Sequence, residues 1–254
     1  MDQRVLVTGG ASGIGREIVR AFAATGAKVF VCDVDPRALD ALAKELPGLA
    51  TGLCDMSKRE AIETMVPFGT KAIGGLDVLV NNVGVSGPTV PIEKLDPAEW
   101  DSVVKINLTS MFDVTRLCVP LLKESPAGVV INLSSVAGRF GYPNRIAYSA
   151  TKWGVVGFTK TLSIELGVYG IRVNAILPGA VDGPRLQSVF EGRAKLSGKT
   201  AEQEAKSIMV NQSLKNLVDP RDIAALAVFL ASPGAKSISG QSLPVDADMQ
   251  SLMI

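Results

Sequence analysis

The sequence predicts an α/β fold in which a doubly wound parallel sheet carries helices on both faces, within a single domain spanning residues 1–254. Short apolar runs alternate along the whole chain with longer segments of helical spacing, the pattern of parallel strands joined by helical crossovers. A glycine-rich turn links the first apolar run to the first helical segment. Polar residues follow several of the apolar runs directly. Because ligands in such sheets bind at the carboxyl ends of the strands, these residues are the candidates for a functional site.

The balance of charges narrows the classes of partner. Lysine and arginine (26) nearly equal aspartate and glutamate (25), so the net charge is only +1. This balance predicts neither a nucleic-acid partner nor an acidic membrane surface. The chain has no histidine. Its absence excludes a histidine-dependent triad and argues against a catalytic zinc site, so we expect no metal.

The cysteines and the chain's beginning indicate a compartment. Cys32, Cys54 and Cys118 stand in apolar runs and are predicted to be buried free thiols, as in a reducing cytosol. The first strand begins by about Arg4, which leaves no room for a signal peptide. The longest apolar helical run, residues 223–231, is far too short to span a bilayer. We therefore expect a cytoplasmic protein.

The first strand, residues 5–7, runs directly into a glycine-rich turn and a helix over residues 14–24. Glycines in this context allow a tight turn and close backbone approach, while the helix N-terminus offers free N–H groups to a phosphate. The spacing is G-x-x-x-G-x-G, which differs from the common dinucleotide fingerprint. A purely structural turn is the alternative. The expected cofactor contacts in this Rossmann-type unit are Gly9, Ser12, Gly13, Ile14 and Gly15.

The second strand, residues 28–32, ends at Asp33. A carboxylate there can accept hydrogen bonds from the ribose 2′-hydroxyl of adenosine and would repel a 2′-phosphate, which predicts NAD rather than NADP. The alternative is that Asp33 caps the helix over residues 36–46, but Asp35 is better placed for that role.

The third and fourth strands, residues 49–54 and 76–80, end in further polar residues. Asp55 can accept a hydrogen bond from an adenine amino group. Ser57 is predicted to cap the following helix, with Glu60 completing a capping box. The fourth strand runs into Asn81 and, after two more residues, Gly84.

A strand over residues 129–133 leads to Ser135, and a long helix follows from Ala147. Tyr148 and Lys152 are four residues apart and therefore share one helix face. A free phenol has a pKa of about 10, and a nearby ammonium lowers it. A hydroxyl, a phenol and an ammonium at the end of a strand suit proton exchange with an alcohol or a carbonyl.

Together these residues resemble the short-chain dehydrogenase/reductase family, in its compact single-domain form, over essentially the whole chain. The motifs that carry the resemblance are Thr8-Gly9-x-x-x-Gly13-x-Gly15, Asp55, Asn81-Asn82-Val83-Gly84, Asn107, Ser135, Tyr148-x-x-x-Lys152 and Pro178-Gly179. The resemblance implies Tyr148 as acid and base and Ser135 as the hydrogen-bond partner of the substrate oxygen. It implies that Lys152 binds the nicotinamide ribose and lowers the Tyr148 pKa, and that Asn107 holds a water linking Lys152 to solvent.

The chain departs from the family pattern just after Pro178-Gly179. The family often has a threonine where Gly183 stands here, and Asp182 adds a negative charge near the expected diphosphate. The resemblance still implies cofactor contacts from Pro178, Gly179 and the backbone of Val181. The role of Asp182 stays open between substrate contact and a turn cap.

Residues 183–211 form the least decided segment, with a helical pattern from Thr200 to Val210. The resemblance makes this segment a substrate lid, and lids draw on weakly packed segments. Arg139, Arg145 and Arg185 are each a candidate to pair with a substrate carboxylate or phosphate. For each of them the alternative is a solvated or interface arginine.

The helix over residues 147–167 is apolar on more than one face. A helix apolar all round is buried all round, which predicts a homo-oligomer through this helix and the one containing Asn107. The resemblance favours a homotetramer over a dimer.

The sequence thus predicts an NAD-dependent oxidoreductase that interconverts a secondary alcohol and a ketone. Two alternatives remain: an NADPH-dependent 3-oxoacyl thioester reductase, which Asp33 disfavours, and a non-catalytic NAD-binding regulator, which the complete acid/base set disfavours.

Overall fold

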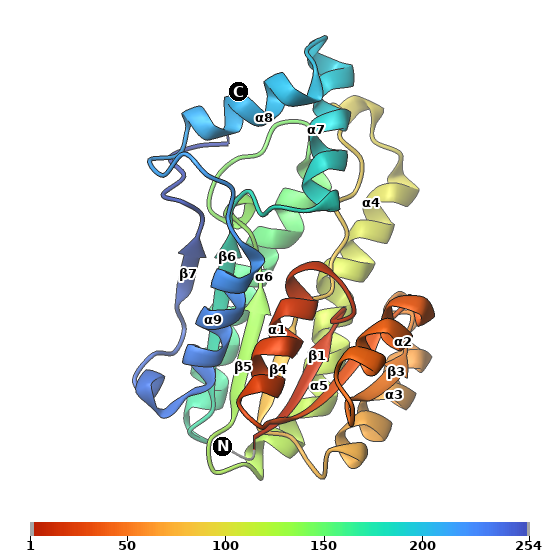
Figure 1. Ribbon diagram of the computed structural model, residues 1–254, viewed down its shortest axis with the longest axis vertical. Coiled ribbons are helices and arrows are strands. Elements are labelled where there is room, and N and C mark those ends of the chain that lie inside the picture. The colour runs from red at the N-terminus through yellow and green to blue at the C-terminus, as the bar shows by residue number, and fades with distance from the viewer. Residues whose placement is uncertain (1–2, 253–254) are drawn as a thin grey trace.

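Seven parallel strands form one sheet in the order β3-β2-β1-β4-β5-β6-β7 in the computed structural model, which describes residues 3–252 (Figure 1). The order reverses direction between β1 and β4, so the carboxyl ends of these two strands form the switch point at which such sheets bind ligands. This arrangement confirms the predicted Rossmann-type, doubly wound sheet. The strands are β1 (Arg4–Thr8), β2 (Lys28–Asp33), β3 (Ala50–Leu53), β4 (Val78–Asn81), β5 (Val129–Leu133), β6 (Arg172–Pro178) and β7 (Ser242–Val245).

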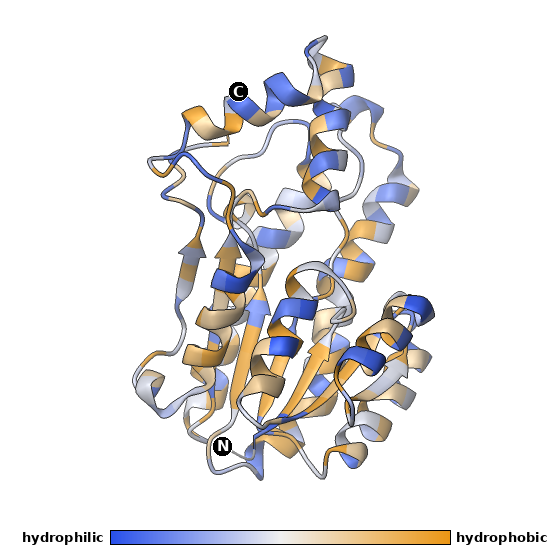
Figure 2. Cartoon of the chain, in the orientation of Figure 1, coloured by the Kyte–Doolittle hydropathy of each residue, from blue (hydrophilic) through white to orange (hydrophobic). Residues whose placement is uncertain are grey.

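Helices cover both faces of the sheet. One face packs against α1 (Gly13–Ala24), α2 (Pro36–Glu45) and α9 (Pro220–Ala231), and the other against α3 (Arg59–Ala72), α5 (Ser110–Lys123) and α6 (Ile146–Gly167). Alternate side chains of one strand enter the two cores: Val5 and Val7 face α1 and α9, while Leu6 faces α3 and α5. Strands buried on both faces need continuous apolar runs, and the central strands are apolar along their length (Figure 2).

The remaining helical segments are not part of these two helical layers. They are α4 (Pro97–Val104), the π-helical η2 (Lys105–Thr109), α7 (Pro184–Ser197), α8 (Ala201–Val210) and the short 3-10 turns η1 (Ile92–Lys94), η3 (Val136–Gly138) and η4 (Pro233–Ala235).

The segment 183–211, left undecided by the sequence, folds into α7 and α8 beyond the carboxyl ends of the strands (Figure 1). The Thr200 side chain accepts from the N–H of Gln203, whose own side chain accepts from the Thr200 N–H, so a capping box starts α8. Phe190 and Ile208 pack with Met249 and Leu252 in a small core separate from the two main ones. These two helices therefore cover the functional edge of the sheet.

One predicted cap is wrong. Helix α3 begins at Arg59 after Lys58, and Ser57 does not cap it. The Ser57 hydroxyl instead donates to Asp55 Oδ1 at 2.7 Å, because a turn at the end of β3 places that carboxylate nearer than the helix N-terminus. Asp35 and Asp219 do cap α2 and α9 by accepting from backbone N–H groups of the first turn.

The three cysteines are buried and free. Burial raises the pKa of Cys54 to about 11 and that of Cys118 to about 12, so both thiols stay protonated near neutral pH. No helix within residues 3–252 is long and apolar enough to cross a bilayer.

Candidate active site

A cavity of about 330 Å³ opens at the carboxyl edge of the sheet, beneath α7 and α8. Its walls come from the glycine-rich turn after β1, the loops after β4, β5 and β6, the start of α6 and the covering helices. The sequence-predicted residues that line it are Gly9, Ser12, Gly13, Ile14, Gly15, Ser135, Tyr148, Lys152, Pro178, Gly179 and Val181. Residues far apart in the sequence thus converge on one space.

Tight packing of η3 against α6 fixes Ser135 relative to Tyr148. Ser135 Oγ accepts from the N–H of Ala137 at 3.1 Å, and Ser149 Oγ donates to the Ala137 carbonyl at 2.8 Å. A Cβ on Gly138 would lie only 2.5 Å from the Lys152 carbonyl oxygen, so only glycine allows this approach. The loop that carries Ser135 is therefore pinned to the helix that carries Tyr148 and Lys152.

Lys152 is buried, and its side chain extends to the carboxyl end of β5. Its Nζ donates to the Leu133 carbonyl at 2.9 Å and lies 5.6 Å from the centre of the Tyr148 ring. Burial, and secondarily the charge of Arg185, lowers the pKa of Lys152 to about 7. The predicted i,i+4 stacking of the phenol and the amine is present, with both side chains on the cavity.

Asn107 stands in the π-helical segment η2 and is fully buried, outside the cavity lining. Its Oδ1 accepts from the N–H of Val85 at 2.7 Å, and its Nδ2 donates to the Val85 carbonyl at 3.0 Å and to Thr151 Oγ1 at 3.1 Å. A Cβ on Gly84 would lie 3.3 Å from Asn107 Oδ1 and 3.4 Å from Lys152 Nζ. Asn107 thus clamps the loop after β4 to α6, a role that spacing alone did not reveal.

The glycine-rich turn forms an open cradle. Gly9 and Gly13 have φ angles of +61° and +53°, in the left-handed region that favours glycine. A Cβ on Gly15 would lie 2.3 Å from the Gly9 carbonyl oxygen, whereas a Cβ on Gly13 would meet nothing within 4 Å. The Ser12 side chain makes no capping bond to α1. The start of α1 can therefore receive a phosphate group.

Asp33 is the last residue of β2 and Asp55 lies just after β3, and neither lines the main cavity. Asp33 Oδ2 accepts from the N–H of Ala11 at 3.0 Å, and its Oδ1 accepts from the N–H of Val34 at 2.8 Å. The carboxylate is thereby tied to the glycine-rich turn. Hydrogen bonds from the Ser57 hydroxyl and N–H lower the pKa of Asp55.

Two consecutive asparagines, Asn81 at the end of β4 and Asn82 directly after it, direct their side chains to different surroundings. The Asn81 side chain points into the sheet and donates to Thr115 Oγ1 at 3.0 Å and to Asn132 Oδ1 at 2.9 Å. Asn82 lines the cavity and donates to the carbonyl oxygens of Thr8 and Gly9. The pleat of β4 sends successive side chains to opposite sides, so Asn82, which the sequence analysis did not select, is the side chain at the site.

The loop after β6 contributes its backbone. A Cβ on Gly179 would lie 2.6 Å from Asp246 Cα, so glycine allows β6 and β7 to end side by side. Val181 pairs with Val218 in an isolated parallel β-bridge. The two hydrogen bonds of this bridge run from the Val218 N–H to the Ala180 carbonyl and from the Asp182 N–H to the Val218 carbonyl. The N–H and carbonyl of Val181 itself therefore face away from Val218.

The three candidate arginines differ in whether they line the cavity. Arg139 is half exposed, does not line the cavity and lies 3.9 Å from the Asp246 carboxylate. Arg145 and Arg185 both line the cavity, together with the exposed Asp182.

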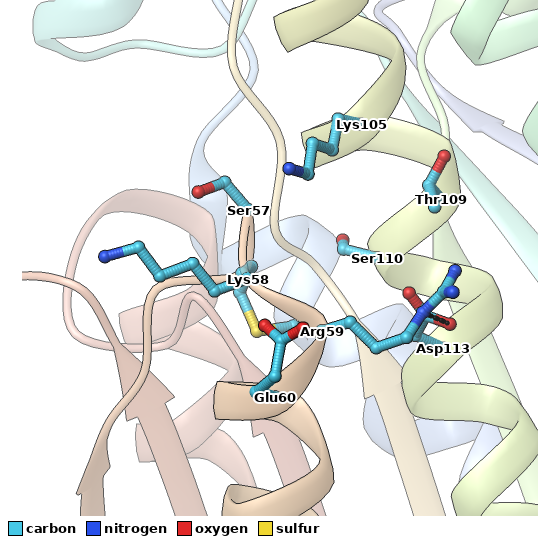
Figure 3. Close-up of a pocket in the computed structure, with 9 residues that line it drawn as sticks. Ser57, Lys58, Arg59, Glu60, Lys105, Thr109, Ser110 and Asp113 are labelled. Atoms are coloured by element: carbon cyan, nitrogen blue, oxygen red, sulfur yellow. Dashed lines mark hydrogen bonds and ion pairs between the residues drawn. The ribbon is translucent and has the colours of Figure 1, made fainter.

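A second cavity of about 310 Å³ lies between the start of α3 and the η2–α5 region (Figure 3). Arg59 reaches across it to Asp113, with Nε 2.9 Å from Oδ1, while Lys58 and Lys105 extend from opposite sides. None of the predicted site residues lines it. Within residues 3–252, no group of three or more acidic or cysteine side chains could hold a metal ion.

The fold and this edge of the sheet define a nucleotide-binding oxidoreductase of the Rossmann type. The family model described as short chain dehydrogenase matches residues 3–194. The D-beta-hydroxybutyrate dehydrogenase of Cupriavidus necator is 39% identical over 241 residues, which are 92% of this chain and 93% of that protein. The chain belongs to the short-chain dehydrogenase/reductase family, as its motifs predict.

Two solved structures extend the comparison. An actinorhodin polyketide ketoreductase with NADPH is 35% identical, with a TM-score of 0.92 and coverage of 97% of this chain and 96% of that one. An NAD+-bound xylitol dehydrogenase is 26% identical, with a TM-score of 0.91 and coverage of 96% and 97%. This fold therefore serves alcohol and ketone redox chemistry with either dinucleotide.

Proposed function

We propose that the chain is an NAD-dependent oxidoreductase that interconverts a secondary alcohol and a ketone, with Tyr148 as the acid and base. The observation that carries the proposal is the convergence of Ser135, Tyr148 and Lys152 on one cavity whose opposite wall is the glycine-rich turn. A hydroxyl that accepts a hydrogen bond, a phenol and a buried amine are the groups that proton exchange with a substrate oxygen requires.

Each group has a distinct task in this proposal. Ser135 holds the substrate oxygen by a hydrogen bond, and the Tyr148 hydroxyl exchanges a proton with that oxygen. Lys152 binds the nicotinamide ribose and, in its protonated form, places a positive charge beside the phenol. Asn107 keeps the loop after β4 against α6 and, by family resemblance, holds a water that connects Lys152 to solvent.

The residues present fit a dinucleotide. The cradle formed by Gly9, Ser12, Gly13, Ile14 and Gly15 would hold the diphosphate at the start of α1. Further contacts would come from Asp33 to the adenosine ribose, Asp55 to adenine, Asn81 and Gly84 after β4, and Pro178, Gly179 and Val181 to the nicotinamide end. When bound, the nicotinamide ring supplies the site that gives or takes the hydride.

The preference for NAD rests on Asp33. Its carboxylate is fixed against the glycine-rich turn by the Ala11 N–H, at the end of the strand where the adenosine ribose binds in this class of fold. The Asp33 carboxylate would accept hydrogen bonds from the ribose hydroxyls, and its negative charge would repel a 2′-phosphate. The structurally similar ketoreductase was solved with NADPH. The alternative function, an NADPH-dependent 3-oxoacyl thioester reductase, is tested by comparing turnover with NADH and with NADPH.

The experiment that tests the chemistry is a screen of alcohols and ketones that follows NADH absorbance, with Tyr148→Phe as the variant and Tyr169→Phe as the control. Tyr169 is exposed and lies outside the cavity. We expect Tyr148→Phe to lose about 10²-fold to 10⁴-fold of turnover while NADH binding, followed by its fluorescence, persists. A wild type inert on the whole panel would instead favour a non-catalytic NAD-binding regulator.

We also propose a cytoplasmic homotetramer with residues 183–211 as a substrate lid. Helices α5 and α6 expose large apolar side chains: Trp153 is 50% exposed, Ile164 79% and Phe112 47%. Apolar surface of this size on adjacent helices supports a subunit interface. Light scattering at micromolar concentration checks this, and a monomer would refute it.

A further inference from the structure

The Arg145 side chain is buried at the cavity without an anionic partner. It is 2% exposed, and within residues 3–252 its guanidinium makes one hydrogen bond, from Nη2 to the Ser86 carbonyl at 2.8 Å. Its Nε and Nη1 are buried and have no hydrogen-bond partner among the described residues. These two nitrogens carry three N–H donors. A buried guanidinium left in this state costs free energy that a bound anion would recover.

The surroundings of Arg145 add positive charge. Its guanidinium carbon lies 5.0 Å from the centre of the Tyr148 ring and 5.2 Å from that of Tyr142. The guanidinium carbon of Arg193, on α7, lies 4.9 Å from the centre of the same Tyr142 ring. Arg193 is itself buried, and its Nη1 and Nη2 have no hydrogen-bond partner among the described residues. Burial lowers the pKa of Arg145, and the charges of Arg193 and Arg185 lower it further.

The acidic side chains nearby do not neutralise this cluster. Asp246 lies next to Arg139, outside the cavity, and Glu204 accepts from the Ser197 hydroxyl at 2.6 Å. Asp182, on the cavity wall, is exposed and forms no ion pair within residues 3–252. The cavity therefore combines Lys152, Arg145 and Arg185 with a single exposed carboxylate.

We infer that the substrate is a short hydroxy acid or oxo acid whose carboxylate pairs with Arg145 while its alcohol or ketone oxygen meets Tyr148 and Ser135. This inference rests on the proposed function and names its substrate class. Arg145 and Lys152 lie at comparable distances, 5.0 and 5.6 Å, from the same phenol ring. Since both groups flank one ring, the carboxylate and the reacting carbon are separated by only a few carbon atoms.

The cavity's size supports a small substrate. Its volume of about 330 Å³ would have to hold the nicotinamide end of the cofactor as well as the substrate. Arg185 of α7 lines the same cavity and adds positive charge on the side of the expected anion. A guanidinium forms strong charge-assisted hydrogen bonds with a carboxylate, which gives this pairing its selectivity against neutral analogues.

The test compares each acid with its own neutral amide. Lactate, 3-hydroxybutyrate and 4-hydroxypentanoate are assayed with NAD⁺ beside their primary amides, on the wild type, Arg145→Met and Arg139→Met. We expect kcat/KM of the wild type to favour at least one acid over its amide by about tenfold to a hundredfold. Arg145→Met should abolish that preference, chiefly through KM, and Arg139→Met, a loss of the same charge outside the cavity, should preserve it.

A binding measurement separates this inference from the proposed chemistry. Butyrate and butyramide are titrated calorimetrically into the NADH-loaded wild type and Arg145→Met. Tighter binding of butyrate by the wild type alone supports the inference even if every alcohol proves inert, which would count against the proposed function instead. Equal use of acid and amide by the wild type, together with equal binding of butyrate and butyramide, would overturn it. So would a preference for hydroxyalkyl phosphates over the acids.

Discussion

Replacement of Lys152 by methionine should change how stability depends on pH. The lysine is 4% exposed, and burial lowers its pKa to about 7 from an ordinary value of 10.5. Between these two values the unfolded chain binds a proton that the folded protein does not. Stability contributed by this group therefore rises with pH above 7 and is lost as the pH falls through the folded pKa.

The size of the effect follows from the two pKa values. With 7 in the folded state and 10.5 in the unfolded state, the free energy of unfolding should rise by about 2.7 kcal/mol between pH 6 and pH 9. Methionine keeps most of the apolar stem but has no proton to bind. The variant should therefore lack this increment and be more stable than the wild type at pH 6.

Urea denaturation of the dinucleotide-free protein at pH 6, 7.5 and 9, at one fixed protein concentration, measures the effect. Other titrating groups are common to both proteins and cancel in the difference between wild type and Lys152→Met. If that difference is the same at pH 6 and pH 9, Lys152 is not held in a shifted state and the argument from its burial fails.

Three further changes test other parts of the site. Gly15→Ala places a Cβ 2.3 Å from the Gly9 carbonyl oxygen and should weaken NADH binding by at least about tenfold; unaltered fluorescence titration would show that the turn has room. Asp33→Asn removes the charge beside the expected ribose and should shift the ratio of kcat/KM for NADH over NADPH toward NADPH by about tenfold or more; an unchanged ratio would place the selectivity elsewhere. Asn107→Leu leaves the N–H and carbonyl of Val85 without the partners they have now and should cost about 2 to 4 kcal/mol in urea unfolding; a loss below about 1 kcal/mol would mean that the clamp is replaceable.

Local sequence pattern is enough to predict the sheet and the ends of its strands, and it places Tyr148 and Lys152 on one helix face. Alternation of apolar runs with helical segments is a local signal, and a parallel sheet is its only well-packed outcome. Tyr148 and Lys152 were paired by helix periodicity, which holds wherever the helix lies. The glycine-rich turn was identified because it stands between a strand and a helix.

Which of two neighbouring polar residues faces the cavity depends on long-range packing. Ser57 bonds to Asp55 rather than capping α3 because of the turn after β3. Asn82 rather than Asn81 lines the cavity because successive side chains at a strand end point in opposite directions. Arg139 and Arg145 are six positions apart and equivalent in the sequence, yet one lies beside Asp246 and the other is buried against Tyr148. Such outcomes depend on partners brought from distant segments, and no local pattern encodes them.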